Sequence, residues 1–158
     1  MSIKLYFERM ADYNRWMNEK VYRSAETLSA ADLQADRGAY FSSVLGTLNH
    51  ILVADTIWLK RFATHPTRFP ALQSMHQVDA PSSLTSILHS TLSNLAKARR
   101  VMDESIIQFC AEAGDDDYCE HLHYTNTSGQ PFVNEFGSLV QHFFNHQTHH
   151  RGQVTTLL

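Results

Sequence analysis

The sequence contains few of the residues that cross-link or interrupt a fold. Its 158 residues include two cysteines, four prolines and six glycines. Cys110 and Cys119 form no CxxC pair and cannot build a disulfide framework, which favours a reducing cytoplasm. No apolar run approaches the roughly 20 residues that a membrane span needs, and the N-terminus lacks the apolar region of a signal peptide. We therefore expect a cytoplasmic protein with no membrane partner.

An excess of positive charge is also missing. The chain has 13 Lys and Arg against 16 Asp and Glu, a net charge of −3. Without a basic stripe, the sequence excludes nucleic acid as an expected partner. The one dense basic cluster, Lys97, Arg99 and Arg100, is interpreted as a solvated helix face. Hydrophobic residues make up 43% of the chain, which is typical of a globular protein, and the length fits a single domain over residues 1–158.

The scarcity of proline and glycine leaves long segments in which apolar residues recur every three or four positions, the period of a helix. Helices are predicted at about Ser2–Leu28, from Ser42 or Ser43 to about Ala63, from Ser82 or Ser83 to about Ala113, and from Asn134 to Leu158. The last pattern has no helix-ending signal, so we expect a C-terminal tail to follow it. An irregular crossover at residues 65–81 separates the second and third helices. This order predicts an all-α four-helix bundle with a long crossover.

A short β-hairpin is predicted immediately before the last helix. Polar and apolar residues alternate from His121 to Thr125, and residues 126–130 have the composition of a turn. Alternation places His121 and His123 on one side of the hairpin. They would either line the edge of a pocket or face solvent.

Histidine is the residue that the chain has in excess, with ten copies. His146 and His150 are four positions apart in the last predicted helix, which brings their side chains together on one face. Apolar neighbours turn this face toward the core. Two imidazoles placed in this way are suited to share a metal ion.

A metal site needs at least one further ligand. His50 is the best candidate, because it lies mid-helix on a mostly apolar stripe of the second helix. Three neutral imidazoles with an open fourth position are typical of catalytic zinc, although imidazole also suits nickel, copper and iron. From the residues alone, the alternative is that these are ordinary core histidines with one hydrogen bond each. His142 and His149 lie to the side of the pair, as proton carriers or as surface residues.

One familiar zinc motif is absent. An HExxH metalloprotease has glutamate after the first histidine as a general base, and this chain has Gln147 there. A neutral amide cannot take a proton from water, so the sequence argues against a metalloprotease of the HExxH type.

Three segments resemble those of the DinB family. They are YNRWMNEKVY at residues 13–22, LNHILVADTIWLKR at 48–61 and FNHQTHHRGQ at 144–153. The resemblance covers nearly the whole chain, including the hairpin. It implies a usually dimeric four-helix bundle in which three histidines hold a divalent metal. Carried over by motif, these are His50, His146 and His150.

The resemblance implies a metal site more strongly than a reaction. Related proteins transfer low-molecular-weight thiols such as mycothiol or bacillithiol, or use a thiol to isomerise maleylpyruvate. We therefore expect zinc or nickel as the metal, a small thiol as a second cofactor, and a small electrophilic molecule as substrate. The alternatives are a metal-dependent hydrolase and a non-catalytic bundle that only binds a metal or ligand. No catalytic residue beyond the metal ligands is predicted.

Three further polar residues occur at predicted helix positions. Asn14 and Asp55 are central on the first and second helices, where we expect a buried contact between them that fixes helix register. The other reading of Asp55 is an acceptor that orients a ligand imidazole. Arg151 is expected at the surface or in a dimer contact.

A homodimer is expected from the second helix, which has two apolar sides where a bundle needs one. Tyr6 and Tyr13 add an aromatic flank on the first helix. The predicted interface uses parts of both helices.

Overall fold

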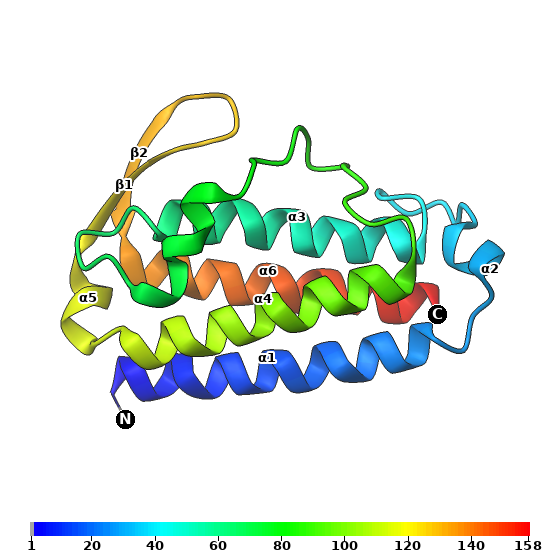
Figure 1. Cartoon of the computed structure of the whole chain (residues 1–158), viewed down its shortest axis with the longest axis horizontal. Coiled ribbons are helices and arrows are strands. Elements are labelled where there is room, and N and C mark those ends of the chain that lie inside the picture. Colours follow the sequence, from blue (N-terminus) through cyan, green and yellow to red (C-terminus); the bar gives the residue numbers. More distant parts are fainter. Residues whose placement is uncertain (1) are drawn as a thin grey trace.

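The computed structural model describes residues 2–158 and forms a four-helix bundle (Figure 1). The long helices are α1 (Ile3–Ala25), α3 (Val44–Phe62), α4 (Leu92–Glu112) and α6 (Phe136–Leu157). The shorter elements are α2 (Ala30–Gln34), the 3-10 helix η1 (Pro70–Gln77), α5 (Asp115–Cys119) and the strands β1 (His121–Thr125) and β2 (Pro131–Glu135). The predicted fold class is confirmed. No helix of the described chain has the length and apolarity to cross a membrane.

Helix direction explains the long crossover. Helices α1 and α6 run one way along the bundle, and α3 and α4 run the other way (Figure 1). Helix α1 packs on α4 and α6, and α3 packs on the same two helices. Because α3 and α4 are parallel, the chain between them must travel back along the whole bundle, and it does so over α3.

The third helix begins later than the sequence predicts. Helix α4 starts at Leu92 and is capped by Thr91, whose side chain accepts a hydrogen bond from the backbone of Asn94. The prediction of a cap at Ser82 or Ser83 is wrong because the chain before Thr91 is held by α3. The side chain of Asn49 there binds both the backbone N–H and the backbone carbonyl of His89, each at 3.0 Å. The crossover therefore extends to Ser90.

The hairpin is confirmed, with β1 and β2 antiparallel and His123 opposite Val133. Asn134 does not cap the last helix, as had been predicted. It lies in β2, and its side chain accepts a hydrogen bond from the Tyr124 hydroxyl at 3.1 Å. The strand instead continues to Glu135, and α6 begins directly after it.

Two apolar clusters fill the bundle, and a buried polar layer separates them. The cluster at the hairpin end contains Phe62, Phe109, Phe136 and Phe143, and the cluster at the opposite end contains Val21, Leu48, Leu95 and Val154. The layer between them takes residues from all four long helices: Asn14, Asn18, Asp55, Arg99, Asp103, Gln147 and Arg151.

The polar layer corrects the predictions made for its members. Arg99 is buried, not solvated, because Asp55 accepts a hydrogen bond from it at 2.5 Å and Asp103 lies 3.0 Å away. Arg151 is buried as well, since it donates to Asn14 and Asn18. Asn14 and Asp55 therefore do not contact each other as expected, since each is paired with an arginine.

Candidate metal centre

The first turns of α3 place His50 inside the bundle. Ser43 caps the helix by accepting a hydrogen bond from the backbone of Gly46 at 3.0 Å. Glycine is needed at that position, since a Cβ on Gly46 would lie 2.2 Å from the backbone oxygen of Phe41. The segment before α3 can therefore pass close to the helix. This approach brings the Phe41 ring over His50, with ring centroids 3.7 Å apart and planes 15° from parallel.

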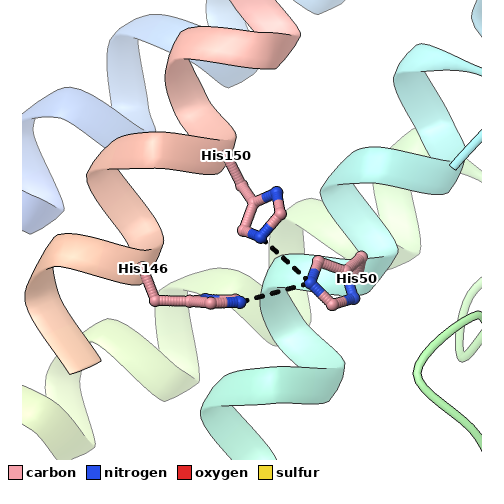
Figure 2. A group of neighbouring side chains, drawn as sticks. All are labelled: His50, His146 and His150. Carbon is pink, nitrogen blue, oxygen red and sulfur yellow. Dashed lines mark hydrogen bonds between the residues drawn. The ribbon is translucent and has the colours of Figure 1, made fainter. Parts of the chain in front are cut away.

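The structure brings together the three histidines that were predicted as ligands (Figure 2). His50 reaches across from α3, and its Nε2 lies 3.3 Å from Nε2 of His146 and 3.2 Å from Nε2 of His150. One ring nitrogen from each of the three lies within 4.8 Å of the other two. His50 and His150 are 4% and 8% exposed, so the cluster is largely shielded from water.

The outer nitrogens of two rings have their own partners. Nδ1 of His50 donates to the backbone carbonyl of Leu84 at 2.9 Å, and Nδ1 of His150 donates to the side-chain oxygen of Gln153 at 2.7 Å. A neutral imidazole carries one N–H, so both rings turn an Nε2 lone pair toward each other. Two lone pairs 3.2 Å apart repel unless a positive charge lies between them.

The cluster fits a divalent transition metal. Two nitrogens bound at 2.0–2.1 Å to a tetrahedral ion lie about 3.3 Å apart. The two separations measured from His50, 3.2 and 3.3 Å, agree with this value. An all-imidazole donor set suits zinc, nickel, copper or iron better than calcium or magnesium. Metal coordination by His50, His146 and His150 remains a prediction that this geometry supports.

The electrostatics of the cluster also favour metal over protons. Burial and the nearby imidazoles of His150, His50, His142 and His149 lower the pKa of His146 to about 3. Burial lowers the pKa of His50 and of His150 as well, against the opposing effect of their bonds to Leu84 and Gln153. All three rings are therefore neutral at pH 7, the form that binds a metal.

The cluster opens into a pocket of about 260 Å³. The residues that line it are His50, Ala54, Ile57, Trp58, Arg61, Leu84, Asn126, Thr127, His142 and His146. These come from α3, α6, the crossover and the hairpin turn. The pocket therefore gives a small molecule a route to the histidines between four different parts of the chain.

The remaining histidines lie outside the cluster. His142 lines the pocket, with its ring 5.3 Å from that of Trp58, and His149 is exposed beside His150. His121 and His123 are exposed on β1. No partner was predicted for His65, but its ring is fully buried between those of Phe69 and Phe136, and its Nε2 lies 3.5 Å from Glu120.

The groups that orient the ligands were not found from the sequence. An orienting role was the alternative interpretation of Asp55, but the partner of Asp55 is Arg99. The acceptors are the Leu84 carbonyl and Gln153. Gln153 could have been found, since it lies three residues after His150 on the same helix face. A backbone carbonyl in an irregular crossover leaves no such signal.

Comparison with known proteins identifies similar sequences. The model of the DinB family matches residues 1–158. Protein DinB of Bacillus subtilis (strain 168) is 22% identical to this chain over 150 residues, which cover 95% of this chain and 83% of the relative. No solved structure matches the chain significantly.

Proposed function

The chain belongs to the DinB family, as its motifs predicted, and we propose that it is a metal-dependent enzyme that transfers a low-molecular-weight thiol to small electrophilic molecules. His50, His146 and His150 would hold one divalent ion, zinc or nickel. The proposal depends chiefly on one observation: Nε2 of His50 on α3 lies 3.3 Å from Nε2 of His146 and 3.2 Å from Nε2 of His150 on α6, in a largely buried cluster. This arrangement costs free energy without a cation, so a binding role explains it better than packing does.

The protein's own groups prepare the site for a ligand. The Leu84 carbonyl and Gln153 hold the Nδ1 protons of His50 and His150, which fixes both rings with Nε2 toward the metal position. Phe41 covers the flat face of His50 and excludes water from that side. The divalent ion, when bound, would lower the pKa of a thiol that it binds and so supply a thiolate at neutral pH.

An open site supports catalysis over a structural role. Structural zinc is normally closed by four protein ligands. Within residues 2–158, no fourth His, Cys, Asp or Glu joins the cluster. The side of the cluster that includes His50 and His146 faces the pocket, where a thiol and a second molecule could enter.

Hydrolysis is the second candidate, and one residue favours it. A hydrolase needs a general base near the reacting water. No carboxylate lines the 260 Å³ pocket, but His142 does, with its ring 6.3 Å from that of His146. A thiol attack needs no such base once the thiolate has formed, and for this reason we place transfer first.

Metal analysis and thiol-conjugation assays test the proposal together. The protein, purified without a histidine tag, should contain close to one equivalent of zinc or nickel. It should then accelerate conjugation of an electrophile such as monochlorobimane with bacillithiol, mycothiol or glutathione. Conjugation that is unchanged after metal removal would contradict metal-dependent thiol transfer, as would the absence of any conjugation by the metal-loaded protein. Ester hydrolysis that is lost in His142→Ala would favour the second candidate.

We also propose a homodimer, formed chiefly through α1. Tyr6, Tyr13 and Trp16 are 39%, 44% and 50% exposed on one helix, an unusual density of aromatic surface. The second apolar side of α3 gives less support than its sequence implied, because Val53 is already fully buried within one chain. Light scattering at micromolar concentration tests the proposal, since a monomer mass would contradict it.

A reducing cytoplasm is the location that we propose. Cys110 is buried and Cys119 is exposed, and both are free thiols. An exposed free thiol is more stable in a reducing compartment. Cell fractionation of the native protein tests this location.

A further inference from the structure

Arg61 lies where three adjoining pockets meet. It lines the 260 Å³ pocket of His50 and His146, a 370 Å³ pocket under the crossover, and a groove of about 610 Å³. Ile57, one turn earlier on α3, lines the same three. Arg61 therefore lies between the histidine cluster and the groove, where any molecule that occupied both would pass it.

The Arg61 guanidinium is held in place without using its hydrogen-bond donors. Its central carbon lies 4.6 Å from the ring centroid of Trp58 and 5.2 Å from that of Tyr124. Cation–π contacts of this kind use the charge of the group and leave its N–H donors in the guanidinium plane. Among residues 2–158, the side chain of Arg61 makes no ion pair and no hydrogen bond; the Thr64 hydroxyl donates only to the backbone carbonyl of Arg61.

Within the described chain, a partly buried arginine whose side chain has no hydrogen-bond acceptor is unusual. Arg99 has Asp55 and Asp103, and Arg151 has amide oxygens, so the other inward-facing arginines are paired. The neighbouring Lys60 also lines the groove, but its Nζ already donates to the backbone carbonyls of Met75 and Val78. Arg61 is thus the cation in the groove whose donors are free for a ligand.

The groove beside Arg61 is apolar. Its lining includes Tyr124, Pro131, Phe132 and Val133 from the hairpin. Phe132 and Val133 are 43% and 50% exposed, so apolar surface is available to a ligand. An apolar wall beside a free guanidinium is complementary to an apolar molecule that carries an anionic group.

We propose that Arg61 binds the carboxylate of the substrate, while the apolar part of the substrate lies against Tyr124, Phe132 and Val133. This inference rests on the proposed function and names its substrate class, a small apolar carboxylic acid with an electrophilic centre. The carboxylate pairs with the planar donors of Arg61 in a bidentate manner. Arg61 acts here as a specificity-determining residue that directs the substrate toward His50 and His146.

The test measures binding and needs no turnover. 4-Phenylbutyrate and 4-phenylbutan-1-ol are matched probes that differ in the anionic group. We expect metal-free wild-type protein to bind the carboxylate about tenfold or more tightly than the alcohol, by calorimetry or ligand-observed NMR. Metal-free protein is used because a bound metal ion could itself attract the carboxylate.

Variants of Arg61 test whether this residue binds the carboxylate of the probe. Arg61→Gln should bring the ratio of the two affinities close to one, and Arg61→Lys should keep part of it. Arg100→Gln removes the same charge at an exposed position on α4 and should leave the ratio unchanged. Circular dichroism melting curves of each variant report whether the bundle is intact.

Two results would overturn the inference: no preference for the carboxylate in wild-type protein, or a preference that survives Arg61→Gln. The metal content of the same samples is measured separately. A protein that binds metal but shows no Arg61 effect refutes this inference alone. A protein that shows the Arg61 effect but never retains metal refutes the proposed function alone.

Discussion

Nδ1 of His50 donates a hydrogen bond to the backbone carbonyl of Leu84 at 2.9 Å, so the crossover holds one of the candidate metal ligands. Leu84 lies 34 residues after His50, in a segment without helix or strand. The bond fixes the tautomer of His50 and the angle of its ring. The crossover therefore contributes to the site and is more than a connection between α3 and α4.

Gln153 performs the same task for His150, and this can be tested by mutation. Gln153→Ala removes the oxygen that accepts the Nδ1 proton, so we expect about tenfold or more weaker metal affinity. Gln153→Glu keeps an acceptor and should retain tight binding. Competition titrations with a chromophoric chelator measure the affinities. Gln141→Ala, at an exposed position of the same helix, is the control and should have no effect.

Removal of single histidines tests the ligand assignment. His50→Ala, His146→Ala and His150→Ala should each lose most of the bound metal, because two imidazoles bind far more weakly than three. Changing His142, His149, His121 or His123 to Ala should leave the metal content nearly unchanged, since none of them joins the cluster. Mass spectrometry of purified protein gives the metal content. Full occupancy in His150→Ala at neutral pH would refute the assignment, as would equal loss from His149→Ala.

The sequence predicted the candidate site better than its surroundings. His146 and His150 share one helix, so their spacing was sufficient to predict that they meet. His50 required knowledge of which helices touch, and the family resemblance supplied it. The orienting carbonyl of Leu84 depends on the path of the crossover, which has no periodic pattern to read.

The burial of charged residues could not be predicted from the sequence for the same reason, because it depends on contacts between distant segments. Local sequence around Arg99 shows a basic cluster, which normally faces water. Its burial depends on Asp55, 44 residues earlier on α3. A helix period indicates which face is apolar, but it does not show which charged residue will find an opposite charge on another helix. Fold class was therefore predictable, and the polar layer was not.

A lower pH should destabilise the metal-free protein, because protonation of His146 favours the unfolded chain. Its pKa is about 3 in the folded state, against an ordinary value of 6.5, so the unfolded chain binds more protons between these two values. The free energy of unfolding should fall as pH drops below 6.5, by up to about 2 kcal/mol at pH 5 from this group. Urea denaturation at several pH values measures the change.

A control is needed because Asp55 changes the free energy of unfolding with pH in the opposite direction to His146. Burial raises its pKa to about 6, so its contribution to stability falls as pH rises from 3.8 toward 6. His146→Ala retains Asp55, and the difference between wild type and this variant isolates the histidine. If that difference does not change between pH 7 and pH 5, the lowered pKa of His146 is wrong.

The polar layer should depend strongly on Arg99. Arg99→Met leaves the carboxylates of Asp55 and Asp103 buried without their cation, and we expect a loss of about 3–5 kcal/mol in the free energy of unfolding. Arg100→Met, the exposed neighbour, should change it by less than about 0.5 kcal/mol. Asp55→Asn added to Arg99→Met should recover part of the loss, because it removes one unpaired charge. Equal stability of Arg99→Met and Arg100→Met would mean that the ion pairs do not hold the bundle.

Two glycines should respond to the same substitution in opposite directions. Gly46→Ala places a Cβ 2.2 Å from the Phe41 carbonyl, and backbone must move to relieve the contact. We expect a loss of about 1–3 kcal/mol in unfolding free energy, and weaker metal binding because Phe41 would no longer stack on His50. Gly152→Ala in α6 meets nothing within 4 Å, so the higher helix propensity of alanine should stabilise the protein by about 0.5–1 kcal/mol. Thermal and urea denaturation, followed by metal titration, measure both effects. If Gly46→Ala were as stable as Gly152→Ala, the close approach of Phe41 to α3 would be wrong, and with it the wall that this segment forms over the histidines.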